Sequence, residues 1–259
     1  MSFDPNKWRE SFSEGSIHRF VPCGQCGEYK VEGEESIRSS QTTASAEEWS
    51  LAAAGEGPGP HDIEERFVAL LKCGACGESI VIAGNKSGEV AVVRTGPEPD
   101  DFDDEMQYTL FPKLIEPPPN LFPIPRDAPL RVHVALRTAF RLYWTDRDAC
   151  VSRLRMAVER FLDSENIPSR RGNDAPIFLS KRLLEYEEQK PSIAKKLEAV
   201  KWLGDTGAHE LGKLNLLSVN DGLKLICAAL EERYEGDKLM GIADAIINKK
   251  GPRTDTGNL

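Results

Sequence analysis

Two short cysteine motifs constrain the fold of this chain more than any other feature of its sequence. The first places two residues between Cys23 and Cys26, and the second does the same between Cys73 and Cys76. This spacer lets both thiolates of a pair point at one ion, and the glycines in and after each motif permit the tight turn. Duplicated pairs of this kind are typical of a site with four sulfur ligands. We therefore predict that the four cysteines bind one structural zinc ion.

Two other interpretations of the cysteine pairs stay open at the level of sequence. The pairs could be redox-active, or they could be thiols that share no ligand. A thioredoxin-type motif opens a helix, whereas both motifs here are followed by β-like residues, which favours zinc. His18 is an alternative ligand and is otherwise a solvated histidine at a strand end. Cys150 and Cys227 fall near apolar helix faces, which indicates buried packing residues.

Charge divides the chain of 259 residues into two parts. Up to Arg126 there are 11 Lys and Arg against 22 Asp and Glu, whereas the remainder has 22 against 20. The first part is therefore acidic, which argues against nucleic-acid binding through bulk electrostatics. No secretory or transit signal is visible, and no apolar stretch reaches the roughly 18 residues of a membrane-spanning helix. The sequence predicts a cytoplasmic protein without membrane contact.

Short β-like runs dominate the first half and predict a small β-rich zinc ribbon over residues 1–96. Asn85 to Gly88 is expected to be the turn of a hairpin between two of these runs. Residues 33–60 are rich in Ser, Ala, Gly and Glu without a sustained period, and are expected to form a flexible insertion. An acidic and proline-rich linker is predicted over residues 97–126, because its prolines favour extended geometry.

From residue 127 the hydrophobic period changes to that of helices. Six segments follow, each amphipathic on one side only, so they are expected to bury their apolar faces against one another. Thr145 with Asp148 looks like a capping box that begins the second segment, and Asp237 is expected to begin the last, with Ile247 inward. We predict an all-α up-and-down helical bundle over residues 127–251, a disordered tail over 252–259, and an α+β chain overall.

A second motif lies near the end of the fourth predicted helix and reads Gly204-Asp205-Thr206-Gly207-Ala208-His209. Together with the proline-rich segment, the helix with Arg155 and Glu159, and the cysteine pairs, it resembles the bacterial family called domain of unknown function 4145. Members of that family typically show Gly-Asn-x-x-Ala-His at this point, and Asp205 stands here in place of Asn. The family looks like a branch of the HEPN helical bundles, many of which are ribonucleases or partners of defence and toxin systems.

The resemblance implies two hypotheses for the function. In the first, the chain is a non-enzymatic module whose HEPN-like bundle binds a protein partner or forms a homodimer, in a bacterial antiviral defence or toxin-linked system. In the second, it is a metal-independent ribonuclease that acts as a dimer, with His209 transferring protons. RNA or a nucleotide is a possible ligand. The candidate binding residues in the helical part are Arg155, Glu159, Lys201 and Asp205.

The arginine of the nuclease motif is missing from this chain. Nuclease members of the HEPN group have four to six residues between an Arg and the His, and at the positions where that Arg would stand this sequence has Trp202, Leu203 and Gly204. Lys201 is one residue too far and carries a point charge in place of a planar guanidinium. A helix cap by His209 and an ion pair of Arg155 with Glu159 are the structural alternatives. The sequence therefore favours the non-enzymatic hypothesis.

Overall fold

The computed structural model divides the chain into two compact units, which we describe separately. The first, called the sheet unit, contains residues 5–120, and the second, the helical unit, contains residues 121–259 with the first four residues. The structure describes residues 3–17, 21–29, 31–32, 37–55, 62–94, 102–172, 174–209 and 212–249. The alternative ligand His18 and the tail predicted over residues 252–259 lie outside these ranges.

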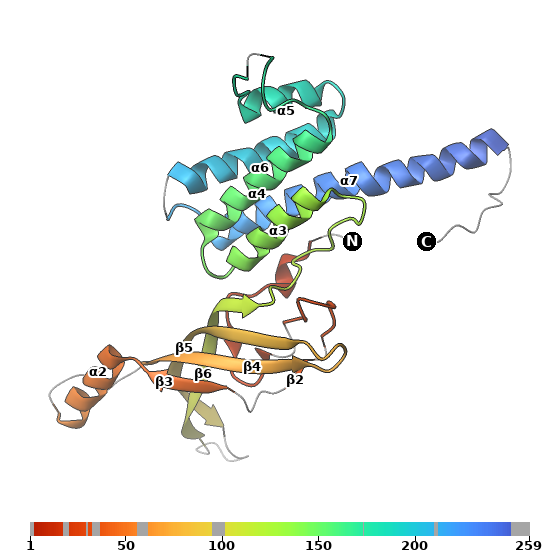
Figure 1. The fold of residues 1–259 in the computed structure, drawn as a ribbon. Helices are drawn as coiled ribbons and strands as arrows, with labels where there is room; N and C mark the ends of the chain where they lie inside the picture. The colour runs from red at the N-terminus through yellow and green to blue at the C-terminus, as the bar shows by residue number, and fades with distance from the viewer. Residues whose placement is uncertain are drawn as a thin grey trace. The chain divides into compact units, whose positions relative to one another are not determined.

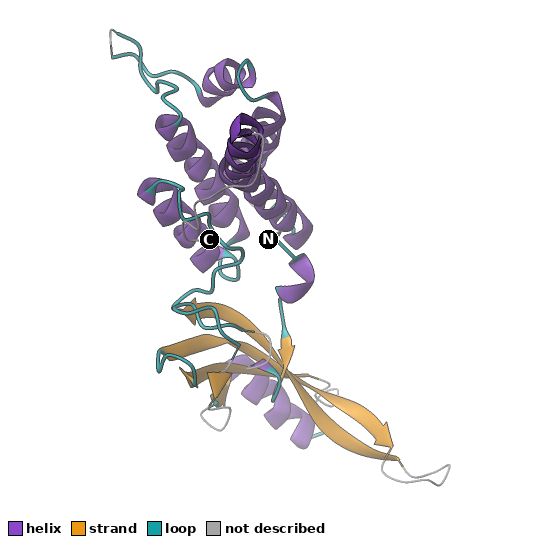
Figure 2. Ribbon diagram, turned by 90° about the vertical axis from the view of Figure 1, so that its right-hand side faces the viewer, coloured by secondary structure: helices purple, strands orange, loops and turns teal. Residues whose placement is uncertain are grey.

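The sheet unit is built on one six-stranded sheet with antiparallel pairing (Figures 1 and 2). The strand order is β1-β6-β5-β4-β2, and β3 also pairs with β4. Two short helical segments accompany the sheet, η1 (Pro5–Lys7) before β1 and α2 (Thr43–Ala53) after β3. The strands are β1 (Phe12–Ser13), β2 (Val31–Glu32), β3 (Arg38–Gln41), β4 (Asp62–Cys73), β5 (Ser79–Arg94) and β6 (Phe102–Glu116).

One face of the sheet carries the core of this unit. Side chains alternate between the two faces of a strand, and every second residue from Phe67 to Cys73 of β4 is buried. The buried apolar residues of the long strands are Phe67, Ala69, Leu71, Ile80, Ile82, Leu110 and Ile115. On the opposite face, Val68 and Leu70 are 45% and 59% exposed. The two faces of the sheet therefore differ, and among the described residues only one of them is covered.

The hairpin turn expected at Asn85 to Gly88 is wrong, because these residues lie in the middle of the continuous strand β5. This stretch pairs with β4 on one side and β6 on the other. Lys86 is buried on the core face, where its Nζ lies 3.0 Å from Glu14 Oε1, 3.2 Å from Glu65 Oε2 and 3.9 Å from the centre of the Tyr108 ring. Pairing on both sides and these contacts outweigh the local preference of Asn and Gly for a turn.

The linker expected over residues 97–126 is also wrong in its central part, since residues 102–116 form β6. β6 pairs with β5, and its residue Leu110 is buried on the core face. The acidic start of the predicted linker is therefore the polar end of this strand. The insertion expected over residues 33–60 contains β3 and α2 within its described part. Thr42 caps α2, and its hydroxyl accepts a hydrogen bond from the Ser45 amide at 3.3 Å.

Five helices form the described part of the helical unit (Figure 1). Two predicted boundaries need correction. Asp146, and not Thr145, caps α4, because its carboxylate accepts a hydrogen bond from the Ala149 amide at 2.9 Å. The last two predicted helices are one continuous helix, α7, and Ile247 is 68% exposed. The bounds are α3 (Leu130–Leu142), α4 (Arg147–Ser164), α5 (Leu179–Glu187), α6 (Pro191–His209) and α7 (Leu216–Lys249).

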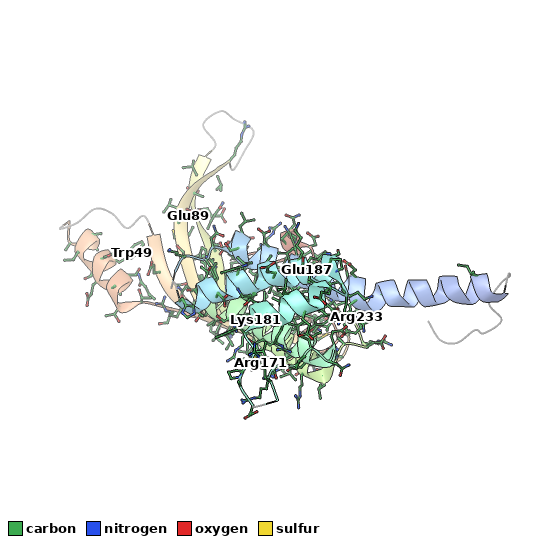
Figure 3. The ribbon with its side chains drawn as sticks, turned by 90° about the horizontal axis from the view of Figure 1, so that it is seen from above. Trp49, Glu89, Arg171, Lys181, Glu187 and Arg233 are labelled. Carbon is green, nitrogen blue, oxygen red and sulfur yellow. The ribbon has the colours of Figure 1, made fainter. Side chains whose placement is uncertain are left out.

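The core of the helical unit lies around α4, which packs against α3, α6 and α7. Aromatic rings meet edge to face in this core, with centroids 5.6 Å apart for Phe161 and Tyr186. The Arg233 side chain of α7, labelled in Figure 3, lies 2.9 Å from Glu165 at the end of α4 and forms an ion pair between the two helices. No helix in the described part of the chain is long and apolar enough to cross a membrane.

Candidate functional site

The two cysteine motifs form two turns with the same geometry. In the first, the Gly27 amide donates to the Cys23 carbonyl at 2.8 Å and the Cys23 amide donates to the Glu28 carbonyl at 2.9 Å. The second motif repeats both bonds with the same lengths, from Gly77 to Cys73 and from Cys73 to Glu78. The glycine that closes each turn has φ near +80°, a conformation that is costly for other residues. The positive φ therefore explains why a glycine follows each cysteine pair.

The four sulfur atoms converge on one point. All four Sγ atoms lie within 4.8 Å of one another, although the two motifs are separated by 46 residues in the sequence. The two closest approaches are 3.7 Å, between Cys23 and Cys76, and 3.6 Å, between Cys26 and Cys73. Each joins a cysteine of one pair to a cysteine of the other. Four sulfurs at about 2.3 Å from a central ion would be about 3.8 Å apart, so the cluster is suited to hold a metal ion.

The protein environment shifts the pKa values of Cys73 and Cys76 in opposite directions. The backbone amide of Cys76 lowers the pKa of Cys73 to about 7, against the opposing effect of burial. The amide of Glu78 acts in the same direction on Cys76, but partial desolvation of the sulfur and the neighbouring thiols outweigh it and raise that pKa to about 12. Thiolates at this separation repel one another, and a dication between them reverses the repulsion. The cluster is thus built for a cation rather than for four free thiols.

Strand pairing and close packing position the two turns. Cys73 is the last residue of β4 and pairs with Val31 of β2, which follows the first turn. The first turn also lies directly against the segment after β6: a Cβ atom at Gly24 would fall on the Pro117 carbonyl oxygen and 2.6 Å from that of Pro118. Gly24 is therefore needed for close approach. Cys23 and Cys73 are buried, while Cys26 and Cys76 are exposed.

The other two cysteines behave as predicted. Cys150 and Cys227 are buried in the helical unit, at 0% and 2% exposure, and neither belongs to the cluster. Burial raises the pKa of the Cys150 thiol to about 12 and that of Cys227 to about 11. Both thiols are therefore protonated near neutral pH and unreactive.

The structure brings the four candidate binding residues of the helical unit into one network between α4 and α6. Arg155 Nε lies 2.8 Å from Asp205 Oδ1, and Arg155 Nη1 lies 2.7 Å from Glu159 Oε1. The second oxygen of Asp205 lies 3.0 Å from Lys201 Nζ. Lys201 is largely buried and its Nζ sits 3.4 Å from the centre of the Trp202 ring. Two cations and two carboxylates thus balance one another.

The glycines of the second motif are packing residues. A Cβ atom at Gly204 would fall on Arg155 Cβ, and one at Gly207 would lie 2.7 Å from both the Asp148 carbonyl oxygen and Val151 Cγ2. Both contacts join α6 to α4. Sequence reasoning missed this role, although the three-residue spacing of the two glycines is a signal for one small helix face. It also missed Trp202, which covers Lys201.

His209 is not part of this network. It lies in the last turn of α6, is exposed, and its imidazole has no hydrogen bond or ion pair with another described residue. The arginine that α4 places next to the Gly204–His209 motif is Arg155. Its guanidinium is already bound to two carboxylates, those of Asp205 and Glu159. The arrangement therefore presents a single exposed histidine beside a closed ion-pair network.

Replacing Asp205 by asparagine should lower the free energy of unfolding of the helical unit by about 1 to 2 kcal/mol, because the buried Lys201 ammonium loses its carboxylate. Burial opposes ionisation of Asp205, but Lys201 and Arg155 outweigh it and hold its pKa below the ordinary 3.8. A depressed pKa stabilises the fold above the unfolded value, and this contribution is lost as pH falls through the folded pKa.

Urea unfolding of wild type and D205N at several pH values tests this prediction. The difference between the two proteins should be constant near neutral pH and should shrink below about pH 4. The variant Asp221→Asn is the control, because Asp221 forms an exposed pair with Lys224 at 3.7 Å. A loss in D205N no larger than in this control would contradict the account of the network.

Comparison with known sequences assigns the helical unit. Curated proteins and solved structures gave no match to the chain. A family model does match, over residues 137–250, and these residues contain α4 to α7 and the Arg155–Asp205 network. Its description is "Domain of unknown function (DUF4145)". The chain therefore carries a DUF4145 domain at residues 137–250, behind a β-sheet region that bears a four-cysteine cluster.

Proposed function

We propose that this chain is a non-enzymatic binding protein, in which a zinc ion orders the sheet unit and the DUF4145 helical unit binds a protein partner. The observation that carries the proposal is the cluster of four Sγ atoms within 4.8 Å of one another. Zinc accepts four sulfur ligands in a tetrahedron, and a site with four protein ligands leaves no position for water or substrate. The metal then has a structural role, because no coordination position is left open for catalysis.

The helical unit supports a binding role more than a catalytic one. Metal-independent cleavage of RNA requires a base near the ribose hydroxyl and an available cation at the phosphate. Arg155 and Lys201 are each engaged with carboxylates at 3.0 Å or less. To bind a phosphate, either cation would first have to leave a carboxylate, which opposes the reaction. The same closed network makes α4 and α6 one rigid surface, with Trp202 60% exposed on it.

The setting of this role follows from the family resemblance. The helical unit would be a HEPN-like bundle, and its partner would be another subunit of a bacterial defence or toxin-linked system. Exposed aromatic side chains beside charged groups are common in the centres of protein interfaces, and Trp202 next to Lys201 fits that pattern. Co-expression with the product of a neighbouring gene is expected to give a stable complex that Trp202→Ala weakens.

Incubation of the purified, metal-loaded protein with labelled RNA separates this proposal from the ribonuclease hypothesis. In buffer without added divalent metal, we expect no cleavage by wild type, His209→Ala or His133→Ala beyond a mock purification. His133 is the matched control, because it is a second histidine of the helical unit whose Nε2 lies 3.2 Å from the Pro125 carbonyl oxygen. Cleavage by wild type and H133A that is lost in H209A would establish the ribonuclease and overturn the proposal.

A further inference from the structure

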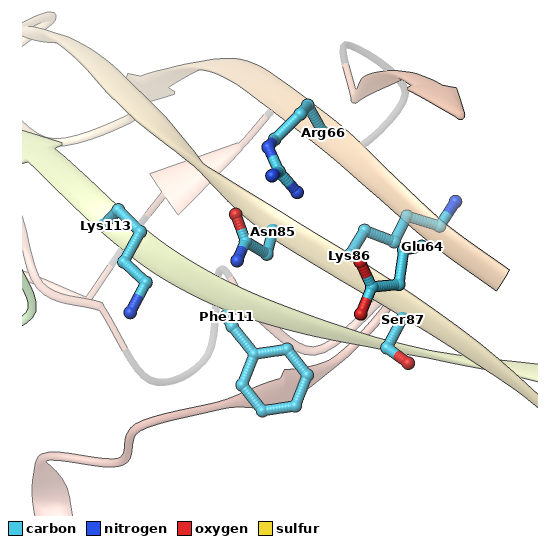
Figure 4. A pocket seen from close by; sticks show the side chains of 7 residues that line it. All are labelled: Glu64, Arg66, Asn85, Lys86, Ser87, Phe111 and Lys113. Atoms are coloured by element: carbon cyan, nitrogen blue, oxygen red, sulfur yellow. The ribbon is translucent and has the colours of Figure 1, made fainter. Parts of the chain in front are cut away.

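The uncovered face of the sheet carries a pocket that is separate from the cysteine cluster. Its volume is about 320 Å³, and it is lined by residues of β4, β5 and β6 (Figure 4). Arg66 pairs with Asn85, and Asn85 pairs with Phe111, so these three residues form one row across three adjacent strands. The row brings a guanidinium, an amide and an aromatic ring together on one face. Glu64, Ser87 and Lys113 complete the lining on this face, and Lys86 also borders the pocket although its ammonium is bound to Glu14 and Glu65.

A β-bulge shapes this pocket. The register between β5 and β6 shifts at Ala83 and Gly84, where Gly84 pairs with Pro112 and Ala83 pairs with Leu114. Lys113 is therefore the extra residue of the bulge and has no partner on β5. A Cβ atom at Gly84 would fall on the Phe111 carbonyl oxygen, so only glycine allows the strands to approach here. Lys113 follows Phe111 by two residues, so both side chains lie on the same face of the strand, and both line the pocket.

Two polar side chains of the pocket, Arg66 and Asn85, are not used to hold the fold together. Neither the Arg66 guanidinium nor the Asn85 amide forms a hydrogen bond or ion pair with the rest of the described chain, although Asn85 is half-buried. Arg155, Arg182 and Arg233, by contrast, each bind a carboxylate. Arg66 and Lys113 outnumber the one acid of the lining, Glu64. The pocket is thus a small cationic spot in a half of the chain with 22 acidic residues against 11 basic ones.

We propose that this pocket binds a ligand with a single carboxylate next to an apolar or aromatic group. Arg66 would receive the carboxylate in a bidentate contact, Asn85 would donate to it from the centre of the row, and Lys113 would supply the second positive charge. The ring of Phe111, which is 36% exposed, would contact the apolar portion. A free aromatic acid and the carboxylate of a peptide share this chemistry. A polyanion such as RNA fits poorly, because the acidic surroundings repel it.

Amide NMR titration of the full-length, metal-loaded protein tests the proposal with two defined probes. The probes are 3-phenylpropionate and an N-acetylated dipeptide that ends in phenylalanine with a free carboxylate. We expect shifts of the amide signals of residues 66, 85, 111 and 113, and no such shifts with the methyl ester of 3-phenylpropionate. Arg66→Gln and Lys113→Gln should each weaken binding about tenfold, the size of one charge-assisted hydrogen bond. Arg66→Lys should keep part of the affinity, because it keeps the charge.

The control is Lys7→Gln, which removes one charge from the same unit outside the pocket. Its affinity should equal that of wild type, and unchanged spectra elsewhere in each variant show that the fold is kept. Binding of only one of the two acids supports the site and identifies its source as a small molecule or a peptide. The proposal would be overturned if the ester bound as well as the acid, or if K7Q and R66Q lost equal affinity. Tighter binding of a short oligouridylate than of either acid would also overturn it. None of these outcomes depends on the partner of the helical unit.

Discussion

Replacing Cys73 by serine is expected to release the metal and unfold the sheet unit while the helical unit stays folded. Cys73 is the last residue of β4, is 1% exposed, and its Sγ lies 3.6 Å from that of Cys26. A hydroxyl is a poor zinc ligand, and structural zinc contributes on the order of 10 kcal/mol to folding. The sheet has only one covered face, so we expect a loss of several kcal/mol that this core cannot offset.

Zinc content and amide NMR spectra of the full-length variant measure this effect. The matched control is Cys150→Ala, which removes a buried thiol outside the cluster and should retain the metal at a cost of about 1 kcal/mol in the helical unit. The signals of the helical unit report whether the two units unfold independently. A C73S protein that keeps both its zinc and the signals of β4 and β5 would contradict the structural role of the metal.

Replacing Gly204 by valine is expected to lower the free energy of unfolding of the helical unit by about 3 kcal/mol. The new Cβ atom would fall on Arg155 Cβ, which lies next to the α4 backbone and cannot move aside as the end of a flexible side chain could. Separation of α4 from α6 would also lengthen the 2.8 Å contact between Arg155 and Asp205. The packing loss and the loss of the ion pair therefore add in the same direction.

Gly236 provides the matched control for this substitution, because a Cβ atom there meets no other atom within 4 Å. Gly236→Ala within α7 should raise stability by about 0.5 to 1 kcal/mol, the usual gain when alanine replaces a glycine inside a helix without a steric clash. Urea unfolding followed by far-ultraviolet circular dichroism compares the two variants. The account predicts effects of opposite sign, and a neutral Gly204→Val would show that the motif glycine is not a packing residue.

The sequence predicted the metal cluster and the helical unit because both follow from local rules. The paired cysteines, their spacing and the glycines that end each turn determine the geometry of each half of the site. The amphipathic period identified the helical segments. The sequence could not place Arg155 and Asp205 together, and the structure joins them by an ion pair. Periodicity does not specify how helices are joined, however, and α7 continues through Asp237 where a new start was expected.

The errors in the first half share one physical cause, which is that strand pairing overrides local preference. Asn85 and Gly88 favour a turn in isolation, and the acidic start of residues 102–116 resembles a linker, yet both segments are strands of one sheet. The pocket of Arg66, Asn85 and Phe111 arises only from this pairing, since its three residues come from three strands. No pattern within one segment could have predicted it.

Native mass spectrometry of the protein, purified without added metal, tests the central claim most directly. One spectrum gives both the number of bound ions and the oxidation state of the cysteines. The account predicts the mass of the reduced chain plus one zinc ion, with all four cluster thiols ionised around it. A metal-free chain, lighter by the hydrogens lost in forming two disulfides, would contradict it.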